Sequence, residues 1–336
     1  MTVDLKTDSL KEAKDRSIRK LIIQIPCFNE AGTLAVALAA LPREVYGYDV
    51  VEWLVIDDGS TDDTVKVARE NGVDHVVSLR YNQGLARGFM AGIEASLRLG
   101  ADTIVNTDAD NQYDASCIPA LVKPIISGEA DYVIGSRPIV DHPHFSPIKK
   151  ALQRLGSWSV RVASGSNIPD APSGFRAIHR DAAMRLNVFN DYTYTLETII
   201  QAGRKNIKMA SIPVDVNPDL RPSRLVKSMS SYIKRSIGTI ARFFMIYKPL
   251  RAFFMLGGLF LIPAFALGIR FIWLTVTGQG AGNIQSLILL SVLATAGFLS
   301  FMLGMMADLL SINRQLLEDV RTRLLRAEIE GRDKNA

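Results

Sequence analysis

Short apolar segments rich in β-branched residues alternate with helical patterns over the first part of the chain. The expected strands are Leu21–Ile25, Val51–Ile56, His75–Leu79, Thr103–Thr107 and Asp131–Ile134. Apolar residues recur at helical spacing between them, over Gly32–Leu41, Asp62–Glu70, Leu85–Leu99 and Ser116–Ser127. This alternation predicts an α/β fold in which helices cover both faces of a mostly parallel sheet.

Two long apolar runs follow towards the C-terminal end, Ala252–Thr277 and Ile284–Ala307. Each exceeds the roughly 20 apolar residues that a helix needs to cross the hydrocarbon core of a bilayer. The segment between them, Gly278–Asn283, is uncharged, whereas both outer flanks carry arginines. The charges predict a transmembrane hairpin whose outer ends, together with the α/β domain, lie in the cytoplasm.

Amphipathic segments border the two apolar runs. Residues 228–248 carry isoleucines and basic residues at helical spacing, which is typical of a helix lying in the membrane interface. Beyond Asp308, apolar residues recur every three or four positions, at Leu309, Ile312, Leu316, Val320 and Leu324. This stripe predicts a helix that either packs against its own α/β domain or contacts another copy of the chain.

Five parts are therefore expected along the 336 residues. They are an N-terminal extension without chemistry (1–20), an α/β domain (21–227), an interfacial helix (228–248), two transmembrane helices (249–307) and a cytoplasmic C-terminal helix (308–336). With 48% hydrophobic and 22% charged residues, the composition excludes a disordered chain. Two cysteines exclude both a disulfide-stapled scaffold and a four-cysteine zinc site.

Basic residues are concentrated next to the apolar runs. Nine of the 39 lysines and arginines lie in residues 220–307, which contain no Asp or Glu. The rest of the chain has 30 basic residues against 34 acidic ones. The net charge of +5 therefore reflects a basic collar suited to anionic lipid, and no nucleic-acid partner is expected.

Polar clusters follow all five expected strands. They are Pro26–Glu30, Asp57–Thr64, Asn82–Gly88, Asp108–Gln112 and Gly135–Arg137. Ligands of open α/β sheets bind at the carboxyl ends of the strands, so a ligand site is expected there. No G-x-G-x-x-G follows a strand and G-x-x-x-x-G-K-[ST] is absent, which argues against dinucleotide oxidoreductases and P-loop phosphohydrolases.

Asp108 and Asp110 form the pair with the clearest chemistry. Two carboxylates at one strand end suit Mg²⁺ or Mn²⁺, with a substrate diphosphate completing the coordination shell. An isolated pair also fits a solvated loop, and Ser60 or Asp62 could simply cap the next helix. The joint presence of Asp57-Asp58-Gly59-Ser60 at the preceding strand end favours a nucleotide site.

From Leu21 to Lys227 the chain resembles the GT-A-fold family-two glycosyltransferases. The motifs that carry this resemblance are Pro26-x-x-Asn29-Glu30, Asp57-Asp58-Gly59-Ser60, Asn82-x-Gly84 and Asp108-x-Asp110. A narrower resemblance to polyprenyl-phosphate glycosyltransferases of the dolichol-phosphate mannose synthase group comes from Gly135-Ser136-Arg137, Asp170-x-x-Ser173-Gly174-Phe175-Arg176 and the membrane hairpin.

The resemblance also implies roles for individual residues. Those expected to hold the nucleotide sugar are Pro26, Phe28, Glu30, Ile56, Asp58, Gly84, Asp108 and Ala109. Asp110 and Gln112 are expected to hold Mg²⁺ or Mn²⁺. The resemblance places Arg137, Arg221 and Lys227 at the donor or acceptor phosphates. Arg176 is expected there as well, because two anionic substrates need cations between them. Arg221 and Lys227 depart from the family pattern, because Pro222-Ser223-Arg224-Leu225-Val226 separates them where the family often has a Gly and a Ser.

Three residues are catalytic candidates: Asp110, Arg137 and, as general base, Asp170. A phosphate monoester has its second pKa near 6, so a lipid phosphate is largely a dianion at pH 7 and scarcely needs a base. Asp170 could instead orient Arg176 or the sugar. The expected reaction is inverting transfer of one sugar from a UDP- or GDP-linked donor to a polyprenyl phosphate, at the cytoplasmic face of a bilayer.

Two other functions remain as alternatives. A synthase that elongates a lipid-linked or polysaccharide glycan would need a Q-x-x-R-W motif and more spanning helices, whereas Lys205 follows Gln201-Ala202-Gly203-Arg204 here. A catalytically decayed membrane scaffold would not need the carboxylates of Asp58, Asp108 and Asp110. The expected partners are the nucleotide-sugar donor, the polyprenyl-phosphate acceptor and the lipid bilayer. If the C-terminal apolar stripe is a contact surface, another copy of the chain is a further partner.

The expected orientation can be tested by cysteine labelling of intact cells. Gly280→Cys, in the short loop, should react with a membrane-impermeant maleimide, because that loop faces outwards. Lys334→Cys should react only after permeabilisation. The opposite pattern would place the α/β domain outside the cytoplasm.

Overall fold

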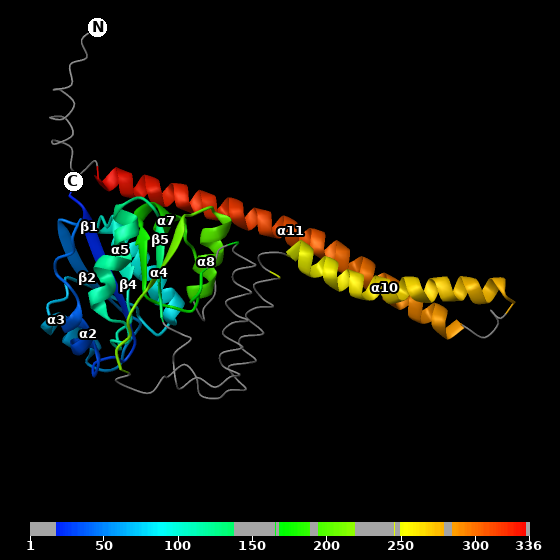
Figure 1. The fold of residues 1–336 in the computed structure, drawn as a ribbon, viewed down its shortest axis with the longest axis horizontal. Helices are drawn as coiled ribbons and strands as arrows, with labels where there is room; N and C mark the ends of the chain where they lie inside the picture. The colour runs from blue at the N-terminus through cyan, green and yellow to red at the C-terminus, as the bar shows by residue number, and fades with distance from the viewer. Residues whose placement is uncertain are drawn as a thin grey trace, which may run out of the picture. The chain divides into compact units, whose positions relative to one another are not determined.

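The computed structural model describes residues 18–137, 165, 168–188, 194–218, 245, 249–278 and 284–333. The chain divides into two compact units, one made of residues 1–224 and 322–336 and the other of residues 225–321. The first contains the sheet and its helices, and the second contains two long helices (Figure 1).

A seven-stranded sheet forms the centre of the first unit. Its strands are β1 (Lys20–Cys27), β2 (Val50–Asp57), β3 (His75–Ser78), β4 (Thr103–Asn106), β5 (Tyr132–Ser136), β6 (Arg176–His179) and β7 (Met209–Pro213). In the order β3-β2-β1-β4-β6-β5-β7, the short β6 runs antiparallel to both its neighbours and every other pairing is parallel. The predicted mostly parallel sheet and its five expected strands are confirmed. Strands β6 and β7 were not predicted.

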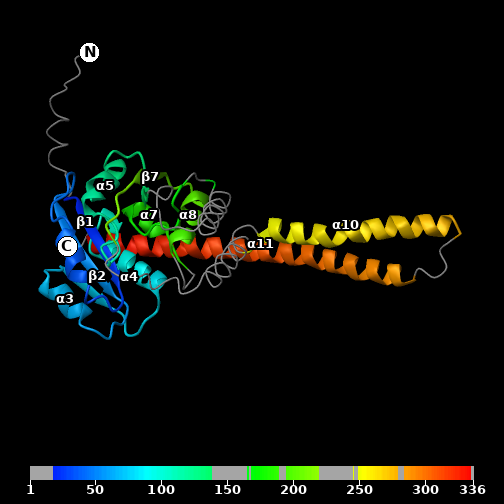
Figure 2. The same ribbon diagram turned by 60° about the horizontal axis from the view of Figure 1, so that its bottom comes forward.

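Helices cover both faces of this sheet (Figure 2). They are α2 (Leu34–Ala40), α3 (Thr64–Glu70), α4 (Leu85–Arg98), η1 (Ala115–Cys117), α5 (Ile118–Ile126), α7 (Arg180–Arg185) and α8 (Thr195–Arg204). Alternate β1 residues, Leu21, Ile23 and Ile25, share one core with α2 and α5. Gln24 points the other way, to the backbone of α4. The alternation of buried side chains on β1 therefore produces two apolar layers, as expected for a strand covered on both sides.

Two helices in the second unit are long and apolar enough to cross a membrane, α10 (Pro249–Val276) and α11 (Ile284–Asp333). Glycines allow them to pack closely. A Cβ at Gly297 would lie 2.6 Å from Leu261 Cγ, and one at Gly257 would lie 2.7 Å from the ring of Phe301. Small residues at such contacts are the usual means by which apolar helices approach each other in lipid.

Helix α11 continues without a break past Asp308, through the stretch expected as a separate C-terminal helix. Its last turns, from Thr322 onwards, belong to the first unit and contact it there. Ile329 is buried, Glu328 pairs with Arg98 of α4 at 3.2 Å, and Thr322 donates a hydrogen bond to the Met184 carbonyl at 3.4 Å.

The apolar stripe noted in the sequence lies on another face of α11. All five of its members are exposed, to between 46% and 66%: Leu309, Ile312, Leu316, Val320 and Leu324. Both expectations for this stripe, a contact with the α/β domain and a contact with another copy of the chain, stay predictions.

Gly59, in the loop after β2, offers a test of how closely this loop packs against the backbone of Tyr81 and Asn82. It has φ +71°, and a Cβ there would lie 2.6 Å from the Tyr81 carbonyl carbon, whereas Gly100 has φ +81° and nothing within 4 Å. Gly100→Ala should cost only the left-handed backbone penalty of about 1–2 kcal/mol, measured as a fall in Tm. Gly59→Ala should lower the Tm several degrees further, because the Asp58–Asn82 region must also shift. Equal losses for the two variants would contradict the structure.

Candidate active site

The end of β2 organises the loop that enters α4. Asp58 is almost fully buried, and its carboxylate accepts hydrogen bonds from the backbone N–H groups of Gln83 at 2.7 Å and Gly84 at 2.8 Å. The preceding Asp57 accepts a hydrogen bond from the Ser60 N–H at 2.9 Å. Both oxygens of Asp58 are thus engaged by the protein backbone, so its visible role is to shape the Asn82–Gly84 loop.

The loop after β1 is tied to the same region. Asn29, with φ +54°, accepts a hydrogen bond from the Thr61 N–H at 2.8 Å and donates its own N–H to Ser60 Oγ at 2.9 Å. Glu30 is buried, and its N–H donates to Thr64 Oγ1 at 2.9 Å. These bonds hold the first two strand ends together, as the convergence of parallel strands requires.

Four of the expected nucleotide-binding residues differ sharply in exposure. Phe28 is exposed and Pro26 is half-buried at the end of β1. Ile56 is completely buried, with its Cδ1 atom against Gly92 of α4, and therefore belongs to the core. Ala109 is also buried, and its side chain belongs to the core that β1 shares with α2 and α5.

Asp108 and Asp110 lie just beyond β4, and both are half-buried. The pKa of Asp108 is raised to about 7, chiefly by burial and then by the neighbouring charge of Asp110, and Glu30 adds to the effect. Arg137 and Arg176 oppose this rise. The structure thus brings these five expected site residues within electrostatic reach of one another.

Asn217, which follows β7 in the chain, holds the loop that carries Asp108 and Asp110. Asn217 donates hydrogen bonds to the carbonyl oxygens of Asn111, at 3.0 Å, and Gln112, at 2.8 Å. Gln112 is half-buried, and its N–H donates to Asp110 Oδ1 at 3.2 Å. The backbone of the loop is therefore set before any ligand arrives.

Gly174 joins this loop to the Asp170–Arg176 turn. Its N–H donates to the Tyr113 hydroxyl at 2.9 Å, and Asn106 donates to its carbonyl at 2.9 Å. A Cβ at this position would lie 3.1 Å from Asp108 Oδ2 and 3.0 Å from the Tyr194 hydroxyl. A side chain at position 174 would therefore force the Asp108 carboxylate or the Tyr194 hydroxyl to move by a few tenths of an ångström.

Arg137 and Asp170 form a two-pronged ion pair. Arg137 Nε donates to Asp170 Oδ2 at 2.8 Å and Nη2 donates to Oδ1 at 3.1 Å, while the Arg137 N–H also donates to Oδ2 at 3.2 Å. Asp170 is fully buried, whereas the Arg137 side chain remains 21% exposed. Because both carboxylate oxygens are used, Asp170 holds the Arg137 guanidinium in a fixed plane.

Arg176 is fully buried and engaged by the protein itself. Its Nε donates to the Ser173 carbonyl at 2.7 Å and its Nη2 to the Ala171 carbonyl at 2.9 Å. Its Nη1 donates to the hydroxyls of Thr198 and Tyr132. The expectation that Arg176 binds a phosphate does not match this environment; the side chain instead fixes the turn that carries Asp170.

Several residues of this region were not singled out from the sequence. Tyr113 immediately follows the Asp108–Gln112 cluster, and Asn106 is a polar residue inside a buried strand, so both carried a local signal. Tyr194 carried none: its ring stacks on Phe89 at 3.9 Å, a contact across more than 100 positions of sequence. Arg221 and Lys227 lie outside the described residues.

Within the described part of the chain, two groups of side chains offer metal-ligating atoms. Asp108 and Asp110 supply only carboxylate oxygens, the donors that Mg²⁺ and Mn²⁺ prefer. A separate group consists of Asp114, Cys117 and Asp215, whose ligand atoms lie within 4.8 Å of one another. Asp114 already accepts a hydrogen bond from the Ser116 N–H at 2.8 Å, and sulfur suits softer metals.

Comparison with known proteins agrees with this arrangement. The sequence model of glycosyl transferase family 2 matches residues 22–186. A glycosyltransferase of Mycobacterium bovis is 31% identical over 199 residues, which cover 58% of this chain and 84% of the relative.

Two further relatives have names that state a reaction. The UDP-N-acetylglucosamine–dolichyl-phosphate N-acetylglucosaminyltransferase of Methanococcus voltae is 27% identical, covering 56% of this chain and 82% of the relative. The undecaprenyl-phosphate mannosyltransferase of Micrococcus luteus is also 27% identical, covering 58% and 82%.

A solved structure shows the same fold. Glucosyl-3-phosphoglycerate synthase from Mycobacterium tuberculosis, in complex with Mn²⁺ and UDP-glucose, superposes with a TM-score of 0.53 at 20% identity, covering 73% of this chain and 84% of that one. The expected GT-A architecture is confirmed. With its seven-stranded mixed sheet, its matching family model and these relatives, the chain belongs to glycosyl transferase family 2.

Proposed function

We propose that this glycosyltransferase moves one sugar, with inversion, from a nucleotide sugar to a polyprenyl phosphate at the cytoplasmic face of a membrane. The observation that carries the proposal is the half-buried Asp108–Asp110 pair within electrostatic reach of an arginine held by the buried Asp170. The names of the Methanococcus and Micrococcus relatives support a lipid phosphate as acceptor. Helices α10 and α11 support a membrane location.

Asp108 and Asp110 fit a bound Mg²⁺ or Mn²⁺, with Gln112 as a further ligand. Both supply hard oxygen atoms in a partly buried place, and the charges of Asp110 and Glu30 both raise the pKa of Asp108. A divalent cation would offset these negative charges, and when bound it would stabilise negative charge on the departing nucleoside diphosphate. The Mycobacterium synthase is crystallised with Mn²⁺ and UDP-glucose, which supports the same ligand class here.

Arg137 supplies a fixed positive charge for the phosphates. Asp170 engages its Nε and Nη2, and no hydrogen bond to Nη1 is found among the described residues. A guanidinium that is oriented in advance can stabilise developing charge without reorganising during the reaction. Arg221 and Lys227 are proposed to add further cations, and Pro26, Phe28 and Glu30 to line the nucleoside site.

Asp170 acts, in this proposal, by positioning Arg137. The reaction joins an acceptor phosphate oxygen to the sugar C1 atom as the bond from C1 to the diphosphate breaks, and the diphosphate leaves with the electron pair. A phosphate dianion brings its own nucleophilic oxygen, so no proton has to be removed at neutral pH. The full burial of Asp170 and its two bonds to Arg137 suit the positioning role.

The reaction is tested with the purified full chain, Mg²⁺ or Mn²⁺, and a panel of UDP- and GDP-sugars. We expect a lipid-linked monosaccharide to form on a polyprenyl phosphate, and none on the neutral polyprenol, which lacks the anionic nucleophile. Asp110→Asn should lower turnover about 100-fold or more, since metal-assisted charge stabilisation contributes several kcal/mol.

Asp114→Asn is the matched control for the metal. It removes one carboxylate from the other group of possible ligands but keeps an oxygen that can accept from the Ser116 N–H. Its turnover should stay within about twofold of wild type. Full activity in the presence of EDTA would contradict the proposed role of a metal ion. Elongation of a glycan chain would contradict polyprenyl phosphate as the acceptor.

The role of Asp170 is tested by comparison with Arg137. Removing a charge-assisted contact worth about 1.5–3 kcal/mol should make Arg137→Ala about 10- to 150-fold slower. Asp170→Asn should be slowed in the same direction with an unchanged pH profile, because it loosens Arg137 without removing a base. Arg19→Ala, at an exposed position, should have little effect. Loss of an acidic limb from the pH profile of Asp170→Asn would instead identify Asp170 as a base.

A further inference from the structure

Helix α11 carries an exposed heptad pattern that glycosyl transfer does not explain. Its positions alternate at intervals of three and four residues, and we call the following set the outer seam: Leu303, Met306, Leu310, Asn313, Leu317 and Val320. The five apolar members are between 52% and 70% exposed. The same spacing already begins at Leu289 and continues through Val292, Ala296 and Leu299. A heptad sustained over this length is typical of a coiled coil.

The chain's own contacts lie on a different face of the helix. Gly297 and Gly304 approach α10, and Ser311 and Glu318, each seven residues further on, are buried. At 100° per residue, this inner face is turned about 100° or more from the outer seam. Figures 1 and 2 show α10 running beside α11 in both views. Helix α10 therefore cannot cover the outer seam as well.

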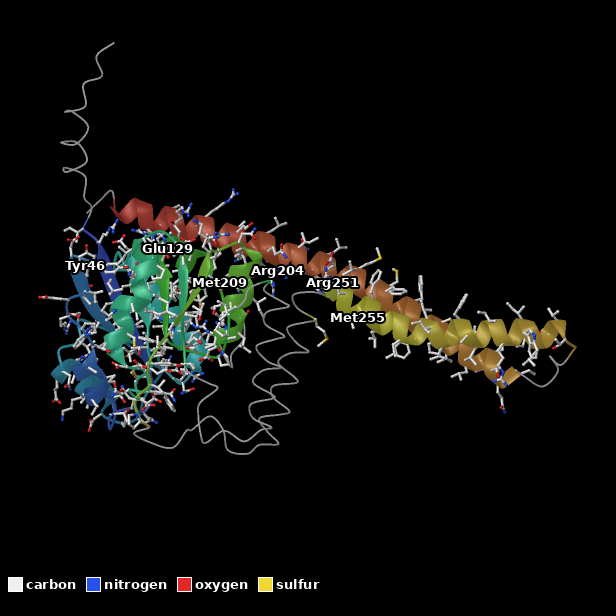
Figure 3. All side chains as sticks on the ribbon, viewed as in Figure 1. Tyr46, Glu129, Arg204, Met209, Arg251 and Met255 are labelled. Carbon is white, nitrogen blue, oxygen red and sulfur yellow. The ribbon has the colours of Figure 1, made fainter. Side chains whose placement is uncertain are left out.

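We propose that the outer seam binds the α11 helix of a second copy of this chain. A 3.5-residue repeat keeps the same face towards a partner helix along its whole length, with a left-handed supercoil. Lipid imposes no such repeat, as α10 illustrates: it is apolar around its circumference, and its Met255, 73% exposed, extends outwards from the ribbon (Figure 3).

The end of the outer seam beyond Asp308 argues further against lipid as the occupant. Charged residues are interspersed there, among them Arg314, Asp319 and Arg321. Leu317 and Val320 nevertheless remain exposed between them. Apolar side chains in such a polar stretch gain most from burial against another protein surface.

Asn313 gives the outer seam a defined register. It is the only polar member among the six, and it is exposed like the others. An asparagine at one core position of a coiled coil pairs best with its counterpart and disfavours shifted alignments, at some cost in stability.

The flanking residues favour a parallel pair. On one flank of the outer seam, Arg314 and Arg321 each directly follow a seam residue. On the other flank, Leu309 and Leu316 each directly precede a seam residue. A parallel arrangement sets each arginine flank against the leucine flank of the partner, whereas an antiparallel one sets arginine against arginine. Two copies anchored the same way in one membrane must also run parallel, an argument that rests on the membrane location proposed above.

Cysteine crosslinking of the full chain in its membrane tests the contact. In a Cys117→Ser background, with the buried Cys27 retained, Leu317→Cys should form a crosslinked homodimer under mild oxidation. Asp319→Cys, exposed on another face of the same turn, is the matched control. We expect at least tenfold more crosslinked product at position 317, and equal yields or none at position 317 would overturn the proposal.

A second measurement keeps the result independent of cysteine chemistry. Two differently tagged copies, produced in one cell, should co-purify, and the double variant Leu317→Glu with Val320→Glu should abolish this, whereas Asp319→Lys should not. Co-purification that survives the double variant would overturn the proposed seam. Transfer activity is measured on the same samples: a monomer that transfers sugar would overturn this inference alone, while an inactive oligomer would overturn only the proposed function.

Discussion

The close approach of Gly174 to the Asp108 carboxylate is the contact on which the candidate site depends. A side chain at position 174 would crowd both the carboxylate and the Tyr194 hydroxyl. Because position 174 carries only a hydrogen, the Asp108–Gln112 loop and the Asp170–Arg176 turn can lie against each other, linked through Tyr113 and Asn106. The acidic and basic halves of the site are thereby held together before any substrate binds.

The acidic and basic side chains of the candidate site offset each other's charge. The charge of Asp110 raises the pKa of Asp108, whereas the half-buried Arg137 and the fully buried Arg176 lower it. Arg176 is enclosed by carbonyl and hydroxyl acceptors and lies near the rings of Tyr132 and Tyr194. The Arg176 guanidinium therefore bonds only to neighbouring groups of the protein that the structure describes, whereas the Arg137 side chain remains partly exposed. A buried cation that shapes a turn and a partly exposed cation that is proposed to meet a phosphate are different uses of the same residue type.

Helix α11 combines two surfaces with different tasks. Its inner face is built from small or buried residues such as Gly297, Gly304 and Ser311, and it packs within the chain. Its outer seam repeats leucines and a single asparagine at heptad spacing. No proline or glycine lies between Gly304 and Gly331, and one continuous helix carries both surfaces.

The sequence by itself determined the local elements and the kind of chemistry. β-Branched strands, helical spacing and the long apolar runs are properties of neighbouring residues, so β1 to β5 and α10 were predictable, as was the acidic pair of Asp108 and Asp110. Only the tertiary structure decided that β6, four residues long, lies between β4 and β5, and that Asp170 meets Arg137 from 33 positions away. It also decided that Ile56 and Arg176 are buried and that Asp58 binds the backbone of Gln83 and Gly84. These outcomes depend on pairings between segments that are distant in the chain. The residues of one segment do not specify by themselves which distant segment will pack against them.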